Sequence, residues 1–436
     1  MKNNMFIPEI ETKTKEEIKK YQERKLPELL GYLNSNSKFY QDVFKEHKID
    51  VKKIKTLEDL TNIPVTTKDD LQKRNKDFLC VDKVKIIDYL STSGILGDPI
   101  VFAMTDSDLD RLAYNEYISF SCADAVQNDI FQLMVTMDKR FMAGMAYYSG
   151  IRKLGAGIVR VGPGNLELQF DTINRISPTA LITVPSFIIK LIEYAEKNNF
   201  DLSRTSIAKA VCIGESIRNE NFELNTLGQK IKDKWDIKLY STYASTEMGT
   251  AFTECAEGKG GHHHPEIIIV EFLDDKNQAV KEGEPGEVTI TNIGVEGMPL
   301  LRFKTGDICI FHTEPCKCGR NTMRLGPVIG RKKQMIKYKG TTLYPPSLYN
   351  ILNNFQNVEN YIVEVYTNEL GTDEILIKVG SNIQNNNFEK EIKDYFRAKI
   401  RVAPTIQFMD PAVISKLQFP EMNRKPIIFI DNRIKK

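Results

Sequence analysis

The apolar residues of this chain follow two spacings, and each spacing predicts its own kind of element. Residues 15–34 (KEEIKKYQERKLPELLGYLN) place apolar side chains three and four positions apart, which predicts an amphipathic helix. Between residues 84 and 214, short apolar runs alternate with helical patterns. The predicted strands are DIFQLMVT, GIVRV, TALITV and AKAVCIG, and the helices between them are FMAGMAYYSGIRKLG, LELQFDTINRI and PSFIIKLIEYAEKN. This alternation predicts an α/β fold with a mostly parallel sheet.

The pattern changes after residue 265. The runs EIIIVEFL and GEVTITNI, separated by the turn-rich DDKNQAVKEGEPG, predict short antiparallel strands in a barrel-like part. A basic, glycine-bounded stretch, GPVIGRKKQMIKYKG, then leads to about a hundred residues in which strands and helices alternate again. We therefore expect a large N-terminal domain over residues 1–331 and a small C-terminal α/β domain over residues 332–436.

Composition and charge narrow the function classes. With 436 residues, 41% hydrophobic and 27% charged, the chain is typical of soluble globular proteins. The net charge of +2 gives no electrostatic reason to expect nucleic acid or an anionic membrane as a partner. No apolar run approaches the roughly 18 to 20 residues of a membrane span. The first residues, MKNNMFIPEIETKTKEE, lack the apolar core of a signal peptide, so we expect a cytoplasmic protein.

Four polar clusters stand at or after strand-like runs. In chain order they are Ser91, Thr92, Ser93, Gly94 and Gly97; Gly214, Glu215 and Ser216; Tyr243, Ala244, Ser245, Thr246 and Glu247; and Thr305, Gly306 and Asp307. Three of them follow predicted parallel strands, whose carboxyl-end turns gather in one crevice. Such a crevice suits a nucleoside triphosphate with Mg²⁺, with Glu247 near the metal and Asp307 on the ribose hydroxyls. For the first cluster taken alone, an ordinary loop is an equal alternative.

Three of the seven cysteines lie in a pattern that suggests a metal. Cys255 precedes a triple histidine, residues 262–264, and Cys316 and Cys318 form Cys-x-Cys about sixty residues later. Three thiolates and one imidazole suit a closed, structural Zn²⁺ site. The three histidines are rivals for the fourth ligand, and a polar loop without metal is the alternative.

Several short motifs, taken in order, carry a resemblance to a known family. YLNSNSKFYQDVF and TLEDLTNIPVTTKDDL resemble N-x-PFY and LP-x-TTK-x-DL, and LGAGIVRVGPGN resembles LGA…GGN. YASTEMG resembles YG-x-TE, MPLLRFKTGD and CKCGR resemble PLLRYRTGD and CPCGR, and GRKKQMIKYKG resembles GR-x-DDMIK-x-RG. These patterns are those of the adenylate-forming superfamily, specifically its phenylacetate–CoA ligase branch. The resemblance covers essentially the whole chain.

This resemblance implies a two-step reaction: ATP and a carboxylic acid form an acyl-adenylate, and CoA then takes the acyl group as a thioester. It implies a mobile small domain hinged near Arg331, and a C-terminal lysine, Lys425 in PEMNRKPIIFIDNR, that serves the first step. It favours His262 as the histidine of the zinc site, and it places Phe141 and Gly144 in the acyl pocket. The implied partners are ATP, CoA and an acid of aryl or arylacetic type, and a homodimer is left open.

The phosphate turn departs from this branch. The family's turn reads Thr-Ser-Gly-Thr-Thr-Gly, followed by Lys or Arg and Pro. Here Ile95 and Leu96 replace two hydroxyls, and Asp98 replaces the cation. A carboxylate placed near a triphosphate repels it by about 1 kcal/mol or more, so we expect a weakened hold on the β- and γ-phosphates.

The acyl segment departs as well. Where the branch has YG-x-F-x-GG, this chain has charged residues at Asp138, Lys139 and Arg140. Either these charges lie in a solvated turn or the substrate carries a polar group. Two rival functions therefore stay open beside the CoA ligase: an adenylating enzyme with an amine or carrier-protein acceptor, and a non-catalytic adenylate-binding relative.

Overall fold

The computed structural model describes residues 6–92, 100–339, 341–368, 372–420 and 426–433, with the backbone alone for residue 342. Within it the chain divides into two compact units, residues 1–328 and residues 329–436. Each unit has an apolar core of its own. In the part of the chain that is described, no helix is long and apolar enough to cross a membrane.

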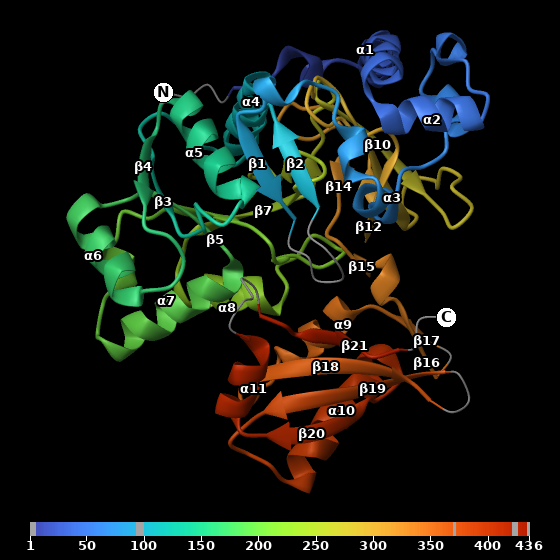
Figure 1. The fold of residues 1–436 in the computed structure, drawn as a ribbon. Helices are drawn as coiled ribbons and strands as arrows, with labels where there is room; N and C mark the ends of the chain where they lie inside the picture. Colours follow the sequence, from blue (N-terminus) through green and yellow to red (C-terminus); the bar gives the residue numbers. More distant parts are fainter. Residues whose placement is uncertain (1–5, 93–99, 340, 369–371, 421–425, 434–436) are drawn as a thin grey trace. The chain divides into compact units, whose positions relative to one another are not determined.

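The larger unit is built on a six-stranded sheet of order β4-β3-β5-β6-β7-β8. Five strands pair in parallel, and the edge strand β8 pairs antiparallel with β7. The strands are β3 (Ile130–Leu133), β4 (Gly157–Arg160), β5 (Ala180–Thr183), β6 (Lys209–Cys212), β7 (Lys238–Ser245) and β8 (Thr250–Thr253). Between them lie the helices α5 (Met142–Leu154), α6 (Leu166–Ile176), α7 (Pro185–Lys197) and α8 (Thr226–Lys234). The prediction of a mostly parallel α/β sheet is confirmed (Figure 1).

The hydroxyl-rich cluster that begins at Ser91 does not follow a strand of this parallel sheet. β1 (Asp88–Ser91) and β2 (Val101–Met104) form a separate two-stranded antiparallel sheet. They are too close in sequence for a parallel crossover, which needs a dozen or more residues. The residues between them therefore join antiparallel neighbours.

The region predicted to be barrel-like contains open antiparallel sheets. β10 (Ile268–Leu273), β11 (Gly286–Asn292) and β12 (Phe303–Cys309) pair in that order. After β12 the chain enters a second sheet, in which β13 (Phe311–His312), β14 (Arg324–Leu325) and β9 (Gly261–His262) pair. Because β10 stays an edge strand, the described strands of this region do not close into a barrel, which corrects the prediction.

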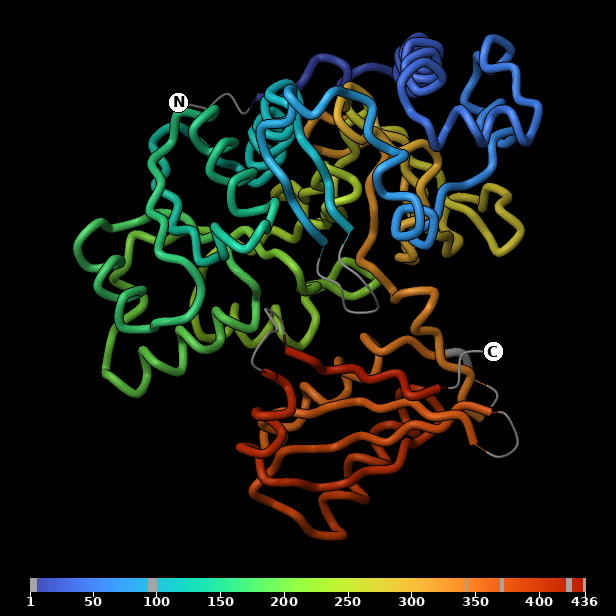
Figure 2. The backbone as a smooth tube through the Cα atoms, in the orientation of Figure 1, coloured from blue at the N-terminus to red at the C-terminus, as the bar shows by residue number. Residues whose placement is uncertain are grey.

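Four α-helices lie in the N-terminal part of the larger unit: α1 (Lys15–Asn36), α2 (Lys38–Glu46), α3 (Lys68–Lys73) and α4 (Asp106–Cys122), coloured from blue to teal in Figure 2. α1 begins at a capping box between Thr14 and Glu17 and buries its leucines in the largest core cluster. α4 packs closely on α5 at Gly150. A Cβ at this position would lie 2.3 Å from the Cβ of Glu116, so only glycine fits there.

The smaller unit holds a four-stranded sheet of order β20-β19-β18-β21. Its central pair is antiparallel, and both outer strands are parallel to their neighbours. The strands are β18 (Asn360–Thr367), β19 (Asp373–Gly380), β20 (Thr405–Met409) and β21 (Phe429–Asp431), and the helices are α9 (Pro345–Leu352), α10 (Asn386–Ile400) and α11 (Pro411–Gln418). Three short strands precede them: β15 (Gly330–Arg331), β16 (Ile336–Tyr338) and β17 (Thr341–Leu343).

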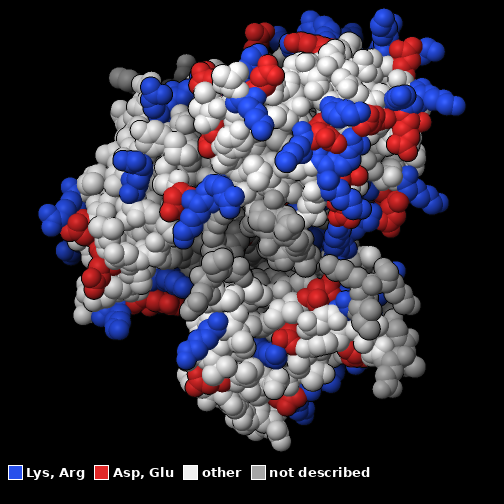
Figure 3. Space-filling view, in the orientation of Figure 1, with Lys and Arg blue, Asp and Glu red and all other residues white. Residues whose placement is uncertain are grey.

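The surface charges are mixed. On the face drawn in Figure 3, lysines and arginines are interspersed with aspartates and glutamates over the larger unit. This agrees with the net charge of +2.

Candidate functional site

Two of the predicted nucleotide-binding clusters meet through one hydrogen bond. Tyr243 lies in β7 and Asp307 in β12, and the Tyr243 hydroxyl donates to Asp307 Oδ2 at 2.8 Å. Asp307 N in turn donates to Thr305 Oγ1 at 3.1 Å. Burial raises the pKa of Tyr243 well above its usual value, and the neighbouring Asp307 carboxylate adds to the rise. The phenol therefore stays protonated and orients the carboxylate.

The Glu247 cluster is part strand and part turn. Tyr243, Ala244 and Ser245 lie within β7 rather than after it, because β7 continues past β6 to pair with β8. The turn between β7 and β8 comprises Thr246 to Gly249. The Glu247 side chain is 12% exposed, and its Oε1 lies 3.9 Å from Lys68 Nζ. Lys68 is the lysine of TTK in TLEDLTNIPVTTKDDL, and that motif gives no sign of its contact with Glu247, which is distant in sequence.

The cluster after β6, residues 214–216, forms hydrogen bonds with the N-terminal turn of α7. Gly214 adopts a left-handed backbone with φ of 73°, which favours glycine. The Glu215 carboxylate accepts from Ser186 N at 2.8 Å and from Ser186 Oγ at 2.9 Å, at the start of α7. Ser216 Oγ donates to Arg218 O at 2.8 Å. Glu215 thus fixes the first turn of α7 beside the carboxyl end of β6.

Of the predicted phosphate turn, the structure describes the first two residues, Ser91 and Thr92. Ser91 N donates to Arg140 O at 3.0 Å, so this strand end is held against the loop before α5. Thr92 N donates to Ile100 O at 3.0 Å, and Thr92 Oγ1 accepts from Ile100 N at 3.3 Å. The remaining predicted residues of the turn, Ser93, Gly94 and Gly97, lie outside the described residues, as do Ile95, Leu96, Asp98 and Lys425. Arg331 belongs to the smaller unit, where it is exposed in β15.

The two predicted acyl-pocket residues lie at the start of α5. Phe141 is the residue before the helix, and Phe141 N donates to Asp138 O at 3.2 Å. A Cβ at Gly144 would lie 2.3 Å from Thr136 O, so this glycine allows α5 to approach the loop after β3. Lys139 and Arg140 are exposed and have φ of 59° and 58°.

A small cavity lies beside the Glu247 turn. Its apolar lining residues include Phe102, Met104, Leu112, Met142 and Met298. Arg111 of α4 and Glu247 line the same cavity. Neither Phe141 nor Gly144 is among the lining residues, but Met142, next to Phe141 in sequence, is.

The four predicted metal ligands lie together. The ligand atoms of Cys255, His262, Cys316 and Cys318 all lie within 4.8 Å of one another. Cys255 Sγ is 3.6 Å from Cys316 Sγ, and Cys318 Sγ is 3.5 Å from His262 Nε2. Zn–S bonds of about 2.3 Å would hold tetrahedral sulfurs roughly 3.8 Å apart, so the spacing fits this metal. Hydrogen bonds with Cys255 and Cys316 hold the pKa of the Cys318 thiol below its usual value.

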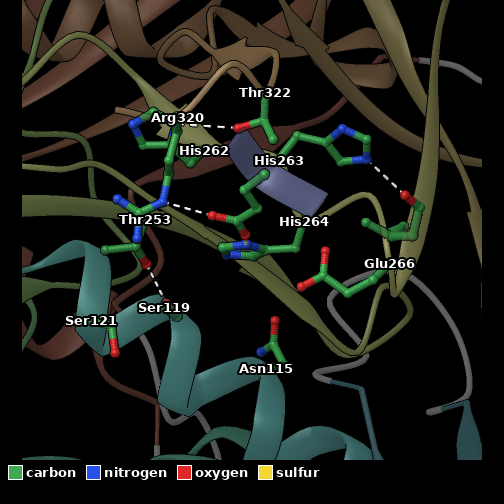
Figure 4. Close-up of polar contacts among 12 residues, drawn as sticks. Asn115, Ser119, Ser121, Thr253, His262, His263, His264, Glu266, Arg320 and Thr322 are labelled. Atoms are coloured by element: carbon green, nitrogen blue, oxygen red, sulfur yellow. Dashed lines mark hydrogen bonds and ion pairs between the residues drawn. The ribbon is translucent and has the colours of Figure 1, made fainter. Parts of the chain in front are cut away.

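The three consecutive histidines have three different partners (Figure 4). His262 faces Cys318 through Nε2, and its Nδ1 lies 3.3 Å from Thr322 Oγ1. His263 Nε2 donates to Ile268 O at 2.7 Å, and burial lowers its pKa to about 4, so it is neutral. His264 Nδ1 donates to the Glu11 carboxylate. The structure therefore brings one of the three rivals, His262, to the cysteines.

A buried charge network lies behind this cluster. Glu11, His264 and Arg320 are each 0% exposed. Arg320 Nε donates to Glu11 Oε2 at 2.6 Å, and Arg320 Nη1 donates to Cys318 Sγ at 3.6 Å. Burial raises the pKa of Glu11, but the charges and hydrogen bonds of His264 and Arg320 outweigh it and hold that pKa below its usual value. Glu11, which no sequence motif marked, links the N-terminal segment to the Cys/His cluster.

Known proteins resemble this chain in sequence and in fold. A phenylacetate–coenzyme A ligase from Thermus thermophilus is 29% identical over 86% of this chain and 84% of its own length. Another from Aromatoleum evansii is 23% identical over 95% of both chains. The structure of a 2-hydroxyisobutyryl-CoA ligase in the postadenylation state with 2-HIB-AMP matches 99% of this chain and 93% of its own, with a TM-score of 0.86 at 20% identity, which shows a shared fold.

The family comparison covers three of the four predicted nucleotide-binding clusters, those at residues 91–97, 214–216 and 243–247. The AMP-binding enzyme family matches residues 68–297, which is more than half of the chain. The chain therefore belongs to the AMP-binding enzymes, the adenylate-forming superfamily, and within them to the phenylacetate–CoA ligase branch.

Proposed function

We propose that this chain is an AMP-forming carboxylate–CoA ligase. The observation that carries the proposal is the Tyr243–Asp307 hydrogen bond, because it joins the two motifs, YASTEMG and RFKTGD, that are typical of adenylate-forming enzymes. The similarity to phenylacetate–CoA ligases over most of both chains supports the same activity.

The reaction has two steps, adenylation of the acid and transfer of the acyl group to CoA. A carboxylate oxygen of the acid attacks the α-phosphorus of ATP, and pyrophosphate leaves. The CoA thiolate then attacks the acyl carbon, and AMP leaves. A free carboxylate is inert toward thiols, so the adenylate supplies the leaving group that the second step needs.

We assign roles in the first step to three residues. Asp307, oriented by Tyr243, accepts hydrogen bonds from the ribose hydroxyls. Glu247 would hold Mg²⁺, which would offset the negative charge of the phosphates. Lys425 brings a cation to the transferred phosphorus, where charge develops. The other residues proposed to bind the nucleotide are Ser91, Thr92, Ser93, Gly94, Gly97, Gly214, Glu215, Ser216, Ala244, Ser245, Thr246 and Arg331.

We propose that the Cys/His cluster binds one structural Zn²⁺. Four protein ligands leave no open position for a substrate. The arrangement of His262 supports this, because its Nδ1 faces Thr322 while Nε2 faces Cys318, as expected of a histidine whose orientation a second partner fixes.

The acid is proposed to carry a compact apolar body of aryl or arylacetic type. The similarity to phenylacetate–CoA ligases supports this class. The small C-terminal unit, residues 329–436, is proposed to be the mobile domain that the two half-reactions require.

The test is pyrophosphate release from ATP and Mg²⁺ with a panel of carboxylic acids, followed by product analysis with and without CoA. We expect AMP and pyrophosphate with an arylacetic or aryl acid, and an acyl-CoA product when CoA is present. Adenylate formation without thioester formation would favour an amine or carrier-protein acceptor instead.

The altered phosphate turn favours a second candidate, a non-catalytic adenylate-binding relative. If Ile95, Leu96 and Asp98 weaken the hold on triphosphate, restoring them to Thr, Thr and Lys should lower the Michaelis constant for ATP. Each well-aligned donor to a charged phosphate contributes about 1.5 to 3 kcal/mol. Tight AMP binding with no ATP turnover in either version would support the second candidate.

A further inference from the structure

Arg111 is a cation of α4 whose hydrogen-bond acceptors are all uncharged oxygens. Its Nε donates to Ile293 O at 2.7 Å, and its Nη1 donates to Gly249 O at 2.8 Å. Its Nη2 donates to Ile267 O at 2.5 Å and lies 3.4 Å from Thr250 Oγ1. Burial lowers the pKa of this guanidinium to about 10, although Asp108 and Glu266 oppose the shift. Arg111 therefore stays charged at neutral pH.

These acceptors come from two different sheets. Gly249 and Thr250 lie at the junction of the Glu247 turn with β8, which belongs to the six-stranded sheet. Ile267 precedes β10 and Ile293 follows β11, both in the neighbouring antiparallel sheet. One rigid fork of donors thus fastens the end of the Glu247 turn to the second sheet, which a single ammonium group could not do.

The turn is fixed at two consecutive peptides directly after Glu247. Asn292 Nδ2 donates to Met248 O at 2.8 Å, and Arg111 holds the next carbonyl, that of Gly249. Gly249 has a left-handed φ of 52°, and a Cβ there would lie 3.5 Å from Arg111 Nη1. Arg111 and Glu247 line the same cavity, and the carbonyl that Arg111 holds lies only two residues after Glu247 in the same turn.

We propose that Arg111 is a positioning residue for Glu247: through the Gly249 carbonyl it holds the carboxylate where Mg²⁺ and ATP are bound during adenylation. This inference rests on the proposed function. It predicts that loss of the fork damages the Mg²⁺-dependent first half-reaction and largely spares the second, which starts from a finished adenylate.

The test replaces Arg111 by lysine, which keeps the charge and removes the fork. In Arg111→Lys we expect kcat/KM for adenylation to fall roughly 10- to 100-fold and the Mg²⁺ concentration for half-maximal rate to rise about threefold or more. Thioester formation from synthetic acyl-adenylate and CoA should stay within about threefold of wild type.

Arg324→Lys is the matched control. Arg324 is also a buried arginine of the larger unit, 7% exposed, but it pairs with the Glu314 carboxylate at 3.1 Å. We expect this control to lower the melting temperature without changing the Mg²⁺ dependence. If Arg111→Lys does not fold, Gly249→Ala is the second variant. It strains the backbone at the carbonyl that Arg111 Nη1 bonds, so it should raise the Mg²⁺ requirement in the same way.

Three results would overturn the inference: an unchanged Mg²⁺ requirement in Arg111→Lys, an equal rise in Arg324→Lys, or equal losses in both half-reactions. The absence of adenylation in the wild-type protein would instead contradict the proposed function. The two failures are therefore distinguishable.

Discussion

The geometry of the buried Glu11 network predicts how much stability the chain loses when the Glu11 charge is removed. In Glu11→Gln the side chain keeps its shape and loses its charge. Arg320, 0% exposed, then loses the carboxylate that it reaches at 2.6 Å, and His264 loses its Nδ1 acceptor. Breaking a buried ion pair from one side costs about 3 to 5 kcal/mol, because the remaining charge stays buried and uncompensated. We expect the free energy of unfolding to fall by about 3 kcal/mol, since the amide oxygen can still accept one hydrogen bond.

The assay is urea unfolding of the full chain at pH 7, with the m-value compared between variants. Glu9→Gln is the control, because Glu9 is exposed and its ion pair with Lys13 at 2.7 Å lies in solvent. The control should unfold like wild type. A Glu11→Gln protein as stable as the Glu9→Gln protein would refute the reasoning.

The stability lost in Glu11→Gln should depend on pH in one direction only. The pKa of Glu11 is lowered in the folded chain, so its contribution to stability is present above its unfolded pKa near 4.5 and is lost as the pH falls through the folded value. The stability difference between wild type and Glu11→Gln should therefore be constant near neutral pH and shrink on acidification. A difference that grows on acidification would contradict the assigned charge.

The remaining predictions concern the metal, the cation of the first step and a buried acid. Purified protein should contain about one zinc per chain, and Cys316→Ser should lower both metal content and melting temperature. The control Cys80→Ser should leave the metal content unchanged. Zinc-free wild-type protein would contradict the proposed zinc site. Lys425→Ala should slow adenylation about 100-fold and spare thioester formation from synthetic adenylate; equal damage to both would argue for a structural lysine. Burial raises the pKa of Glu116 to about 8, so the folded chain binds a proton there that the unfolded chain releases above about 4.5, and stability should fall as the pH rises between these values. Glu116→Gln should remove this fall, and parallel pH profiles for variant and wild type would show that the acid is not neutral when buried.

The sequence by itself determined the elements and the family. The predicted helix LELQFDTINRI is α6, and the predicted strands GIVRV and TALITV contain β4 and β5, because the spacing of apolar residues follows from the faces that each element buries. The parallel sheet followed from the alternation of such elements. The motifs around Glu247 and Asp307 carried the family because their residues are contiguous in sequence.

The tertiary structure decided what depends on contacts between distant segments. Three adjacent histidines have the same local pattern, and what separates them is that Cys318 faces His262, Ile268 O faces His263 and Glu11 faces His264. The hydroxyl-rich stretch after Leu90 has the composition of a turn in either topology, and it is the pairing of β1 with β2 that makes it a connection between antiparallel strands.

Arg111 and Glu11 stand in no motif because their roles come from distant acceptors. Arg111 bonds Gly249, Ile267 and Ile293, which are more than a hundred residues away in sequence. Glu11 meets Arg320 across 309 positions. Buried polar groups must find partners wherever the fold supplies them, and a local pattern carries no record of which distant oxygen or guanidinium that is.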